Sequence, residues 1–229
     1  MPAVIAFLSQ KGGVGKSTLA RALAAVCSHA GLDVVLADLD PQQQTLVHWQ
    51  EARTAHRVTP RLLVEPFDDP TEAIERARNS DLLILDTPGG VNDKTLAIAR
   101  MAHLVVQPTG PSLDDLHPTV LLFHELADAG IPKPRLVAAL CRVLDDDEEA
   151  AARAYLEEAG YEVLEGSIPE SRAYRVAHNR GRSLTESDEQ AFNDRADALI
   201  EALLTKVAAI TSAEDSAEEP TVMPKGGVA

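Results

Sequence analysis

The apolar positions of the chain follow two alternating patterns. Short runs of almost unbroken apolar residues are typical of strands buried on both faces, and longer stretches with an apolar residue every three or four positions are typical of helices. We expect strands at residues 3–8, 33–38, 61–65, 81–86, 103–107, 135–141 and 162–165, and helices at residues 19–26, 43–56, 70–78, 94–101, 116–130, 146–160 and 187–210. This alternation predicts an α/β fold: a doubly wound, mostly parallel sheet flanked by helices in three α/β/α layers.

The length and the end of the chain set the expected domain organisation. A chain of 229 residues with 45% hydrophobic residues is long enough for one sizeable core, so we expect one domain over residues 1–210. Residues 211–229 are acidic, contain Pro, Gly and Ser, and have no hydrophobic period. This composition predicts a disordered tail.

Composition excludes several classes of protein. Cys27 and Cys141 lack the spacing of metal ligands, so we expect two buried thiols in a reducing cytoplasm. No apolar run approaches the roughly 20 residues of a membrane span, and the first apolar run is too short for a signal peptide. A net charge of −15 argues against nonspecific nucleic-acid binding unless cations cluster locally.

The most informative motif lies between the first expected strand and the first expected helix. A glycine-rich loop followed by Lys and Ser, in a strand–loop–helix context, is the arrangement that binds nucleotide phosphates. Lys16 can reach the β- and γ-phosphates, and the Ser17 hydroxyl can ligate Mg²⁺. We expect the nucleotide to contact Lys11, Gly12, Gly13, Val14, Gly15, Lys16, Ser17 and Thr18.

Carboxylates end two of the expected strands. Asp38 and Asp40 are two residues apart at the end of the second strand, where an acid can position water or hold the Mg²⁺ shell. Asp86 ends the most apolar strand and is followed by Thr-Pro-Gly-Gly, so it is expected to hold Mg²⁺ through water. Ser17 and Asp86 are therefore expected at the metal, and either Asp38 or Asp40 could join them.

Lys11 separates this loop from the ordinary phosphate-binding motif. Its form, K-G-G-x-G-K-S, resembles the deviant Walker A motif of the ParA/MinD superfamily, which has the P-loop NTPase fold. The resemblance, which extends to about residue 204, implies that Lys11 reaches the phosphates of a partner subunit in an ATP-sandwich homodimer. Lys11, Lys16 and Asp40 are then the catalytic residues.

Three further segments resemble the same superfamily. Residues 38–42 are similar to its D-x-D-P-Q switch I, which implies that Asp40 positions the attacking water and Asp38 supports the metal shell. Residues 86–90 are similar to its D-x-P-G switch II. Residues 107–114 are similar to a P-x-x-P-S segment near the nucleotide base and the dimer interface, with Pro108, Thr109 and Pro111 as the matching residues; a plain turn explains these prolines equally well.

Four arginines cluster near the end of the expected domain. Arg172 and Arg175 would share one face of a helix, and Arg180 and Arg182 follow closely. The segment resembles a region near the C-terminus of ParA proteins, where basic residues brought together by ATP-dependent dimerisation hold nonspecific DNA. We therefore expect DNA contact from these arginines; the alternative is a solvated helix whose arginines pair with surface carboxylates.

These resemblances imply a small ParA-type ATPase that segregates or positions a plasmid, a chromosome region or a protein cargo. Hydrolysis of ATP would be slow, Mg²⁺-dependent and stimulated by a ParB-like or cargo-adaptor partner, in a cytoplasmic, nucleoid-associated protein without membrane contact. The phosphate loop begins within ten residues of Met1, so we expect no N-terminal DNA-binding domain and no operator-specific repression.

Three rival functions remain as alternatives. A MinD-like membrane-surface ATPase needs a basic amphipathic C-terminal helix, whereas residues 194–210 have a core-like apolar face and are followed by acidic residues. An ATPase of the nitrogenase iron-protein type needs cysteines beside the switches. A ligase of the dethiobiotin synthetase type needs a pocket for a small acid, which nothing in the sequence marks. The cargo is left open.

Overall fold

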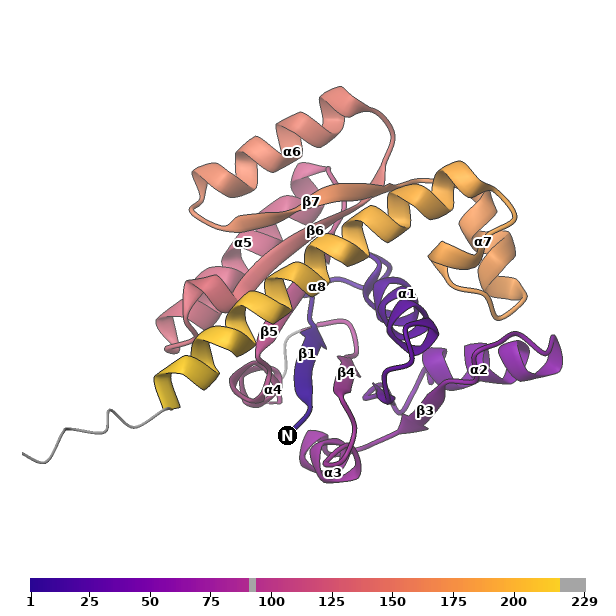
Figure 1. Ribbon diagram of the computed structural model, residues 1–229. Coiled ribbons are helices and arrows are strands. Elements are labelled where there is room, and N and C mark those ends of the chain that lie inside the picture. The colour runs from indigo at the N-terminus through magenta and orange to yellow at the C-terminus, as the bar shows by residue number, and fades with distance from the viewer. Residues whose placement is uncertain (91–93, 219–229) are drawn as a thin grey trace, which may run out of the picture.

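The centre of the computed structural model, which describes residues 1–90 and 94–218, is a sheet of seven strands (Figure 1). Every neighbouring pair is parallel, and the order across the sheet is β3-β2-β4-β1-β5-β6-β7. The predicted parallel α/β sheet is confirmed. The strands are β1 (Ala3–Phe7), β2 (Val34–Asp38), β3 (Leu63–Pro66), β4 (Leu82–Asp86), β5 (Leu104–Thr109), β6 (Leu136–Val143) and β7 (Glu162–Pro169).

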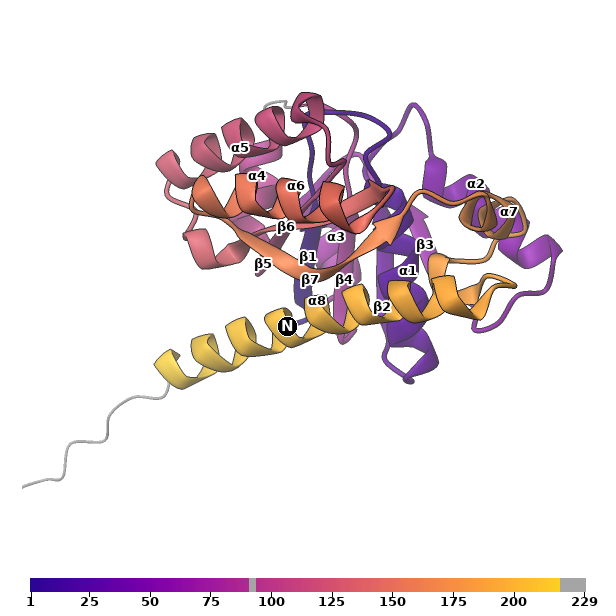
Figure 2. The same ribbon diagram turned by 90° about the horizontal axis from the view of Figure 1, so that it is seen from above.

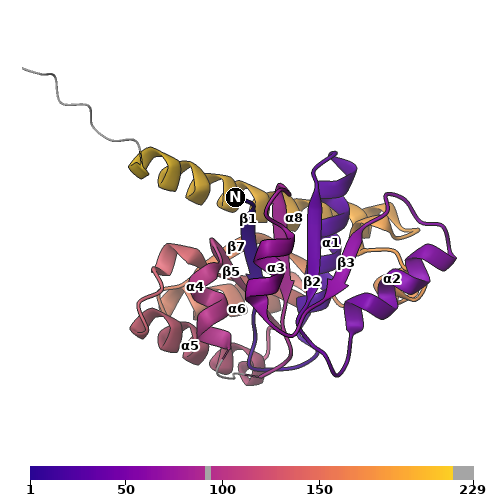
Figure 3. The same cartoon turned by 90° about the horizontal axis from the view of Figure 1, so that it is seen from below.

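Helices cover both faces of the sheet and give the three predicted layers (Figures 2 and 3). One side chain cluster joins the sheet to α1, α2, α7 and α8, and a second joins its other face to α3, α4, α5 and α6. The helices are α1 (Lys16–His29), α2 (Thr45–Ala55), α3 (Pro70–Arg76), α4 (Thr95–Met101), α5 (Leu113–Asp128), α6 (Asp146–Glu158), α7 (Arg172–Asn179) and α8 (Gln190–Glu218), with short 3-10 turns η1 (Lys133–Arg135) and η2 (Leu184–Glu186).

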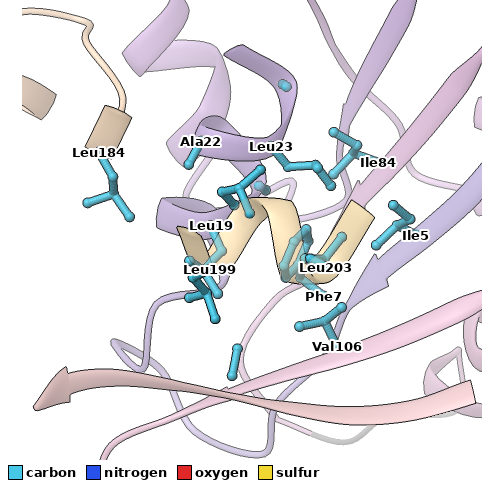
Figure 4. Packing of buried hydrophobic residues seen from close by; sticks show 14 of the residues in the cluster. Ile5, Phe7, Leu19, Ala22, Leu23, Ile84, Val106, Leu184, Leu199 and Leu203 are labelled. Carbon is cyan, nitrogen blue, oxygen red and sulfur yellow. The ribbon is translucent and has the colours of Figure 1, made fainter. Parts of the chain in front are cut away.

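The packing of α1 fixes the position of the loop that precedes it. Leu19 and Leu23 of α1 are fully buried against β1 and β4 on one side and against Leu199 and Leu203 of α8 on the other (Figure 4). Burying each such side chain contributes roughly 1.5–3 kcal/mol. The first turn of α1 is therefore held firmly above the end of β1.

The strand order places the predicted motifs together. The chain leaves β1 toward β2 on one side, and β5 lies on the other side, so the direction of winding reverses at β1. In the register, Asp86 is level with Phe7 of β1 and with Asp38 of β2. Ligands bind at such a reversal, beyond the carboxyl ends of the strands.

The ends of the chain's last elements differ from the expected boundaries. Helix α8 runs to Glu218, past the predicted end at residue 210, so residues 211–218 of the predicted tail are helical and residues 219–229 lie outside the described part. Strand β7 continues to Pro169. Helix α7 includes Arg172 and Arg175, which were expected on one helical face, and its eight residues bury chiefly Tyr174 and Ala177. Within residues 1–90 and 94–218, no helix has both the length and the hydropathy to cross a bilayer.

Candidate functional site

The phosphate loop (residues 9–18) connects β1 to α1 and depends on two glycines with left-handed backbone. Gly13 has φ +76°, and Gly15, which precedes the first residue of α1, has φ +117°. A Cβ at Gly15 would also lie 3.1 Å from Cys141 Sγ on β6. Glycine is therefore required here both for conformation and for space, and the helix N-terminus behind it is open to an anion.

The loop is connected to the end of β4. The Gly90 N–H donates to the Ser9 carbonyl at 3.1 Å, and a Cβ at Gly89 would lie 3.1 Å from the Gly12 nitrogen. Thr87 donates its hydroxyl to the Phe7 carbonyl at 2.8 Å. The segment that resembles switch II, residues 86–90, thus contacts the phosphate loop backbone directly.

The two lysines of the loop have different surroundings. Lys16 is 7% exposed, and its Nζ donates to the Lys11 carbonyl at 3.1 Å across the loop. Burial lowers the pKa of Lys16, and the charges of Asp86 and Asp40 oppose that shift. Lys11 has a side chain that is 39% exposed and pairs with Asp115 of α5 at 3.0 Å. Lys16 belongs to its own site, whereas Lys11 lies at the surface.

Asp86 has the chemistry of a cation ligand. Burial raises the pKa of Asp86 to about 7; a hydrogen bond from Ser17 and the charges of Lys16 and Arg21 oppose this rise, whereas Asp38 adds to it. Within the part of the chain that the structure describes, Asp86 Oδ1 is buried without a hydrogen-bond partner. A buried carboxylate oxygen beside a serine hydroxyl and a helix N-terminus fits a hydrated Mg²⁺ that also contacts phosphates.

The two other predicted acids take different positions. Asp38 is buried, and its oxygens accept N–H groups of Asp40 at 3.1 Å, Leu46 at 2.9 Å and Val47 at 3.4 Å. It therefore holds the loop of residues 39–44 (the Asp40 loop) and the start of α2. Asp40 is partly exposed, and its Oδ1 accepts N–H groups of Gln42 and Gln43.

Three pockets border the phosphate loop, and two of them reach Gly13 and Gly15. One, of 240 Å³, contains the residues predicted for the phosphates and the metal and is lined by Gly12, Gly13, Gly15, Lys16, Ser17, Thr18, Arg21, Asp40, Gln43, Thr45, Asp86, Thr87 and Gly89. The second, of 350 Å³, continues from Gly13 and Gly15 toward Tyr174 and Arg175 of α7 and Cys141 of β6. Both pockets are lined by Gly13 and Gly15 of the phosphate loop, so they adjoin each other there.

The residues predicted to lie near the base are less directly placed. Pro108 Cβ is 3.6 Å from the position of a Cβ on Gly15, and Thr109 is buried at the end of β5. Pro111 lies between Gly110 and the first turn of α5. None of the three lines either pocket, so their contact with a nucleotide stays a prediction.

The four arginines do not share one set of partners. Arg175 pairs with Glu170, which also accepts from Arg142 at 3.0 Å, and it lines the second pocket. Arg180 and Arg182 both pair with Asp188. Arg172 is exposed, and no ion pair joins it to another residue of the described ranges. Three of the four are therefore paired with carboxylates, and their contact with DNA stays a prediction.

Residues 172–186 (the arginine segment) are anchored on α2 by a residue that the sequence analysis missed. The Arg53 side chain is 1% exposed and binds Glu186 at 2.7 and 2.9 Å, the Gly181 carbonyl at 3.0 Å and the Pro60 carbonyl at 3.1 Å. A Cβ on Gly181 would overlap the backbone of Arg53. Trp49 of α2 donates its Nε1–H to the Arg182 carbonyl at 3.2 Å.

Two other site residues were also missed. Arg21 lines the phosphate pocket four residues after Ser17, a spacing at which the helical period could have indicated it. Asp115 binds Lys11, but nothing in the sequence pairs these two positions, which the fold brings together.

Comparison with known proteins identifies the family. Residues 5–184 match the CobQ/CobB/MinD/ParA nucleotide binding domain. The chain is 30% identical over 193 residues to maintenance of carboxysome distribution protein A of Gloeobacter kilaueensis, covering 81% of this chain and 85% of that one. It is 30% identical over 219 residues to the chromosome-partitioning ATPase Soj of Thermus thermophilus, covering 80% and 87%.

A solved structure supports the same fold. The MinD cell division protein of Aquifex aeolicus superposes with a TM-score of 0.70 at 17% identity, covering 89% of this chain and 97% of that one. Because the family model spans most of the chain and the predicted resemblance is confirmed by two relatives, the chain belongs to the MinD/ParA family of nucleotide-binding proteins.

Proposed function

We propose that this chain is a ParA-type ATPase that hydrolyses Mg²⁺-ATP, dimerises with ATP between its subunits, binds nonspecific DNA and positions a cargo. The observation that carries the proposal is the pair of lysines on one loop. Lys16 is buried over the phosphate pocket of its own subunit, whereas the partly exposed Lys11 pairs with Asp115 and would exchange that partner for the phosphates of a second subunit. One buried and one partly exposed lysine on the same loop fit a nucleotide site that a second subunit completes.

The residues at the phosphate loop suit phosphoryl transfer. Loop N–H groups and Lys16 would hold the phosphates, and the Ser17 hydroxyl with the unpartnered Oδ1 of Asp86 would hold Mg²⁺, which neutralises charge on the phosphates. Asp38 is engaged with backbone N–H groups, so we infer that it supports the metal shell indirectly. Asp40 lines the same pocket and would orient the attacking water.

The relatives support a role in positioning or partition. One is named for carboxysome distribution and one for chromosome partition, so the cargo class is not fixed by the comparison. We infer a cytoplasmic, nucleoid-associated protein whose hydrolysis is stimulated by a ParB-like or cargo-adaptor partner.

Dimerisation tests the proposal most directly. With ATP, Asp40→Ala should bind nucleotide, hydrolyse it far more slowly and accumulate as a dimer in sedimentation velocity. Lys11→Ala should bind nucleotide as monomer but dimerise poorly, because its charge acts on the partner's phosphates. Lys206→Ala, which removes a lysine of α8 that pairs with Glu162 of β7, is the control. An Asp40→Ala protein that stays monomeric with ATP contradicts the proposed role of that residue.

DNA binding needs a variant outside the nucleotide pocket. Arg175 lines that pocket, so Arg172→Glu is the cleaner substitution, with Arg100→Glu on α4 as control. The ATP-bound dimer should bind DNA of any sequence, with a log–log salt slope of roughly −0.9 per phosphate neutralised, and Arg172→Glu should weaken binding and flatten the slope. Binding to anionic vesicles instead of DNA would favour a membrane-surface ATPase.

A further inference from the structure

Arg21 is a buried cation beside the phosphate loop that belongs to none of the recognised motifs. It lies on α1 one turn after Ser17, is 7% exposed and lines the phosphate pocket together with Lys16 and Asp86. Burying a charged side chain is costly unless its hydrogen bonds and charge are compensated. An arginine at this position therefore calls for an explanation in terms of the site.

The contacts of Arg21 are made mainly with α2. Its Nη2 donates to the Thr45 carbonyl at 2.8 Å, and its Cζ lies 5.2 Å from the centre of the Trp49 ring. Its Nε is buried and has no partner among residues 1–90 and 94–218, and no ion pair to a carboxylate is formed within those ranges. Burial lowers the pKa of Arg21 to about 10, and the charges of Asp86 and Asp38 oppose the shift.

Arg21 contacts α2, the helix that begins directly after the Asp40 loop. The Gln44 N–H donates to the Asp40 carbonyl at 2.9 Å, and Thr45 is the first residue of α2. Asp38 holds the next N–H groups of the same turn. Arg21 and Asp38 thus hold the first turn of α2 from two sides, from α1 and from β2.

We propose that Arg21 is a positioning residue for ATP hydrolysis: it fixes the first turn of α2, and with it Asp40, relative to the phosphate loop. The inference rests on the proposed ATPase function. A direct phosphate contact is the competing role, but the guanidinium already donates to Thr45 and lies on Trp49, which favours positioning. A shift of about 1 Å in a positioned group can cost about 100-fold in rate.

Two substitutions separate these roles. Arg21→Met keeps the apolar stem but removes the charge and the donors, and Arg21→Lys keeps a charge but not the planar group that both donates to Thr45 and lies on Trp49. Arg78→Met, at an exposed position, is the control. For each variant we would measure steady-state kinetics and the Kd of a nonhydrolysable ATP analogue, well below its melting temperature. Acrylamide quenching of Trp49, the single tryptophan, would report on the packing around α2.

Both variants should lose about 10- to 100-fold in kcat, keep the analogue Kd within about threefold and show greater quenching of Trp49. Unchanged kcat in either folded variant overturns the inference, and so does a large rise in Kd with kcat preserved, which would make Arg21 a phosphate ligand. If Arg21→Met does not fold, Arg21→Lys decides by the same criteria. Absence of ATP hydrolysis by the wild-type protein would instead refute the proposed function, and the inference with it.

Discussion

The phosphate loop and the arginine segment both combine glycines with cationic side chains, yet they are built in opposite ways. The loop takes its shape from its own backbone, through left-handed Gly13 and Gly15 at the start of α1. The arginine segment is shaped by contacts from far along the chain, chiefly the buried Arg53 of α2. A motif whose geometry is local can be recognised in a sequence, whereas a surface whose geometry depends on distant partners cannot.

The largest expected effect belongs to the locally built loop. Lys16→Ala removes the buried ammonium group that lies over the phosphate pocket, and the other buried cation of that pocket, Arg21, already donates to the Thr45 carbonyl. We expect ATP hydrolysis to fall by more than about 100-fold, measured by phosphate release, with the fold intact by circular dichroism. Near-normal turnover would show that this loop is not the catalytic site. The phosphate loop would then no longer be an example of a functional motif with local geometry.

The next effect tests whether distant contacts shape the arginine segment. Gly181→Ala would drive a methyl group into the backbone of Arg53, in addition to straining a φ of +70°. We expect a loss of about 2–4 kcal/mol in the free energy of unfolding, measured by urea denaturation. Gly130→Ala is a matched control, because Gly130 has φ +92° but open space around it; its expected loss is about 1 kcal/mol. Equal losses in the two variants would contradict the proposed anchoring.

A pH titration of stability tests the burial of His178 in the arginine segment. Burial, with the charge of Arg21, lowers the pKa of His178 from 6.5 to about 4. Because the unfolded chain binds the proton more readily, the contribution of neutral His178 to stability is complete above about pH 6.5 and is lost as the pH falls through 4. At pH 5 the loss is about 2 kcal/mol. The stability of His178→Gln should therefore fall less than that of the wild type between pH 7 and pH 5; parallel curves would contradict the shift.

The smallest effect concerns the contact between Lys11 and Asp115, which lie far apart in the sequence. The Lys11–Asp115 pair is partly exposed, so Asp115→Ala should change the free energy of unfolding by only about 1 kcal/mol. Because Lys11 is then released, ATP-dependent dimers should form at lower protein concentration in sedimentation velocity. Weaker dimerisation would mean that Asp115 supports the interface itself.

The sequence predicted the strands and the nucleotide motifs because each depends on local pattern. The positions of Lys16, Ser17 and Asp86 follow from strand–loop–helix order and from the carboxyl ends of parallel strands. The sequence could not predict that Asp115 would bind Lys11 or that Arg53 would be buried against Glu186. The partner of a charged residue is set by tertiary contacts, which no local pattern shows. For the same reason the sequence could not predict that Arg175 pairs with Glu170 while Arg180 and Arg182 pair with Asp188.

The contact between Gly15 and Cys141 has a consequence for how this protein can evolve. The small Cys141 thiol lies beside Gly15, which has no side chain. Strand β6 therefore partly determines how much space the phosphate-loop backbone has. A mutation of Cys141 to a larger residue would push against the loop even though no motif residue had changed. Descendants of this chain should therefore accept only small residues at position 141. A larger side chain would be tolerated there only after the backbone of the phosphate loop has shifted.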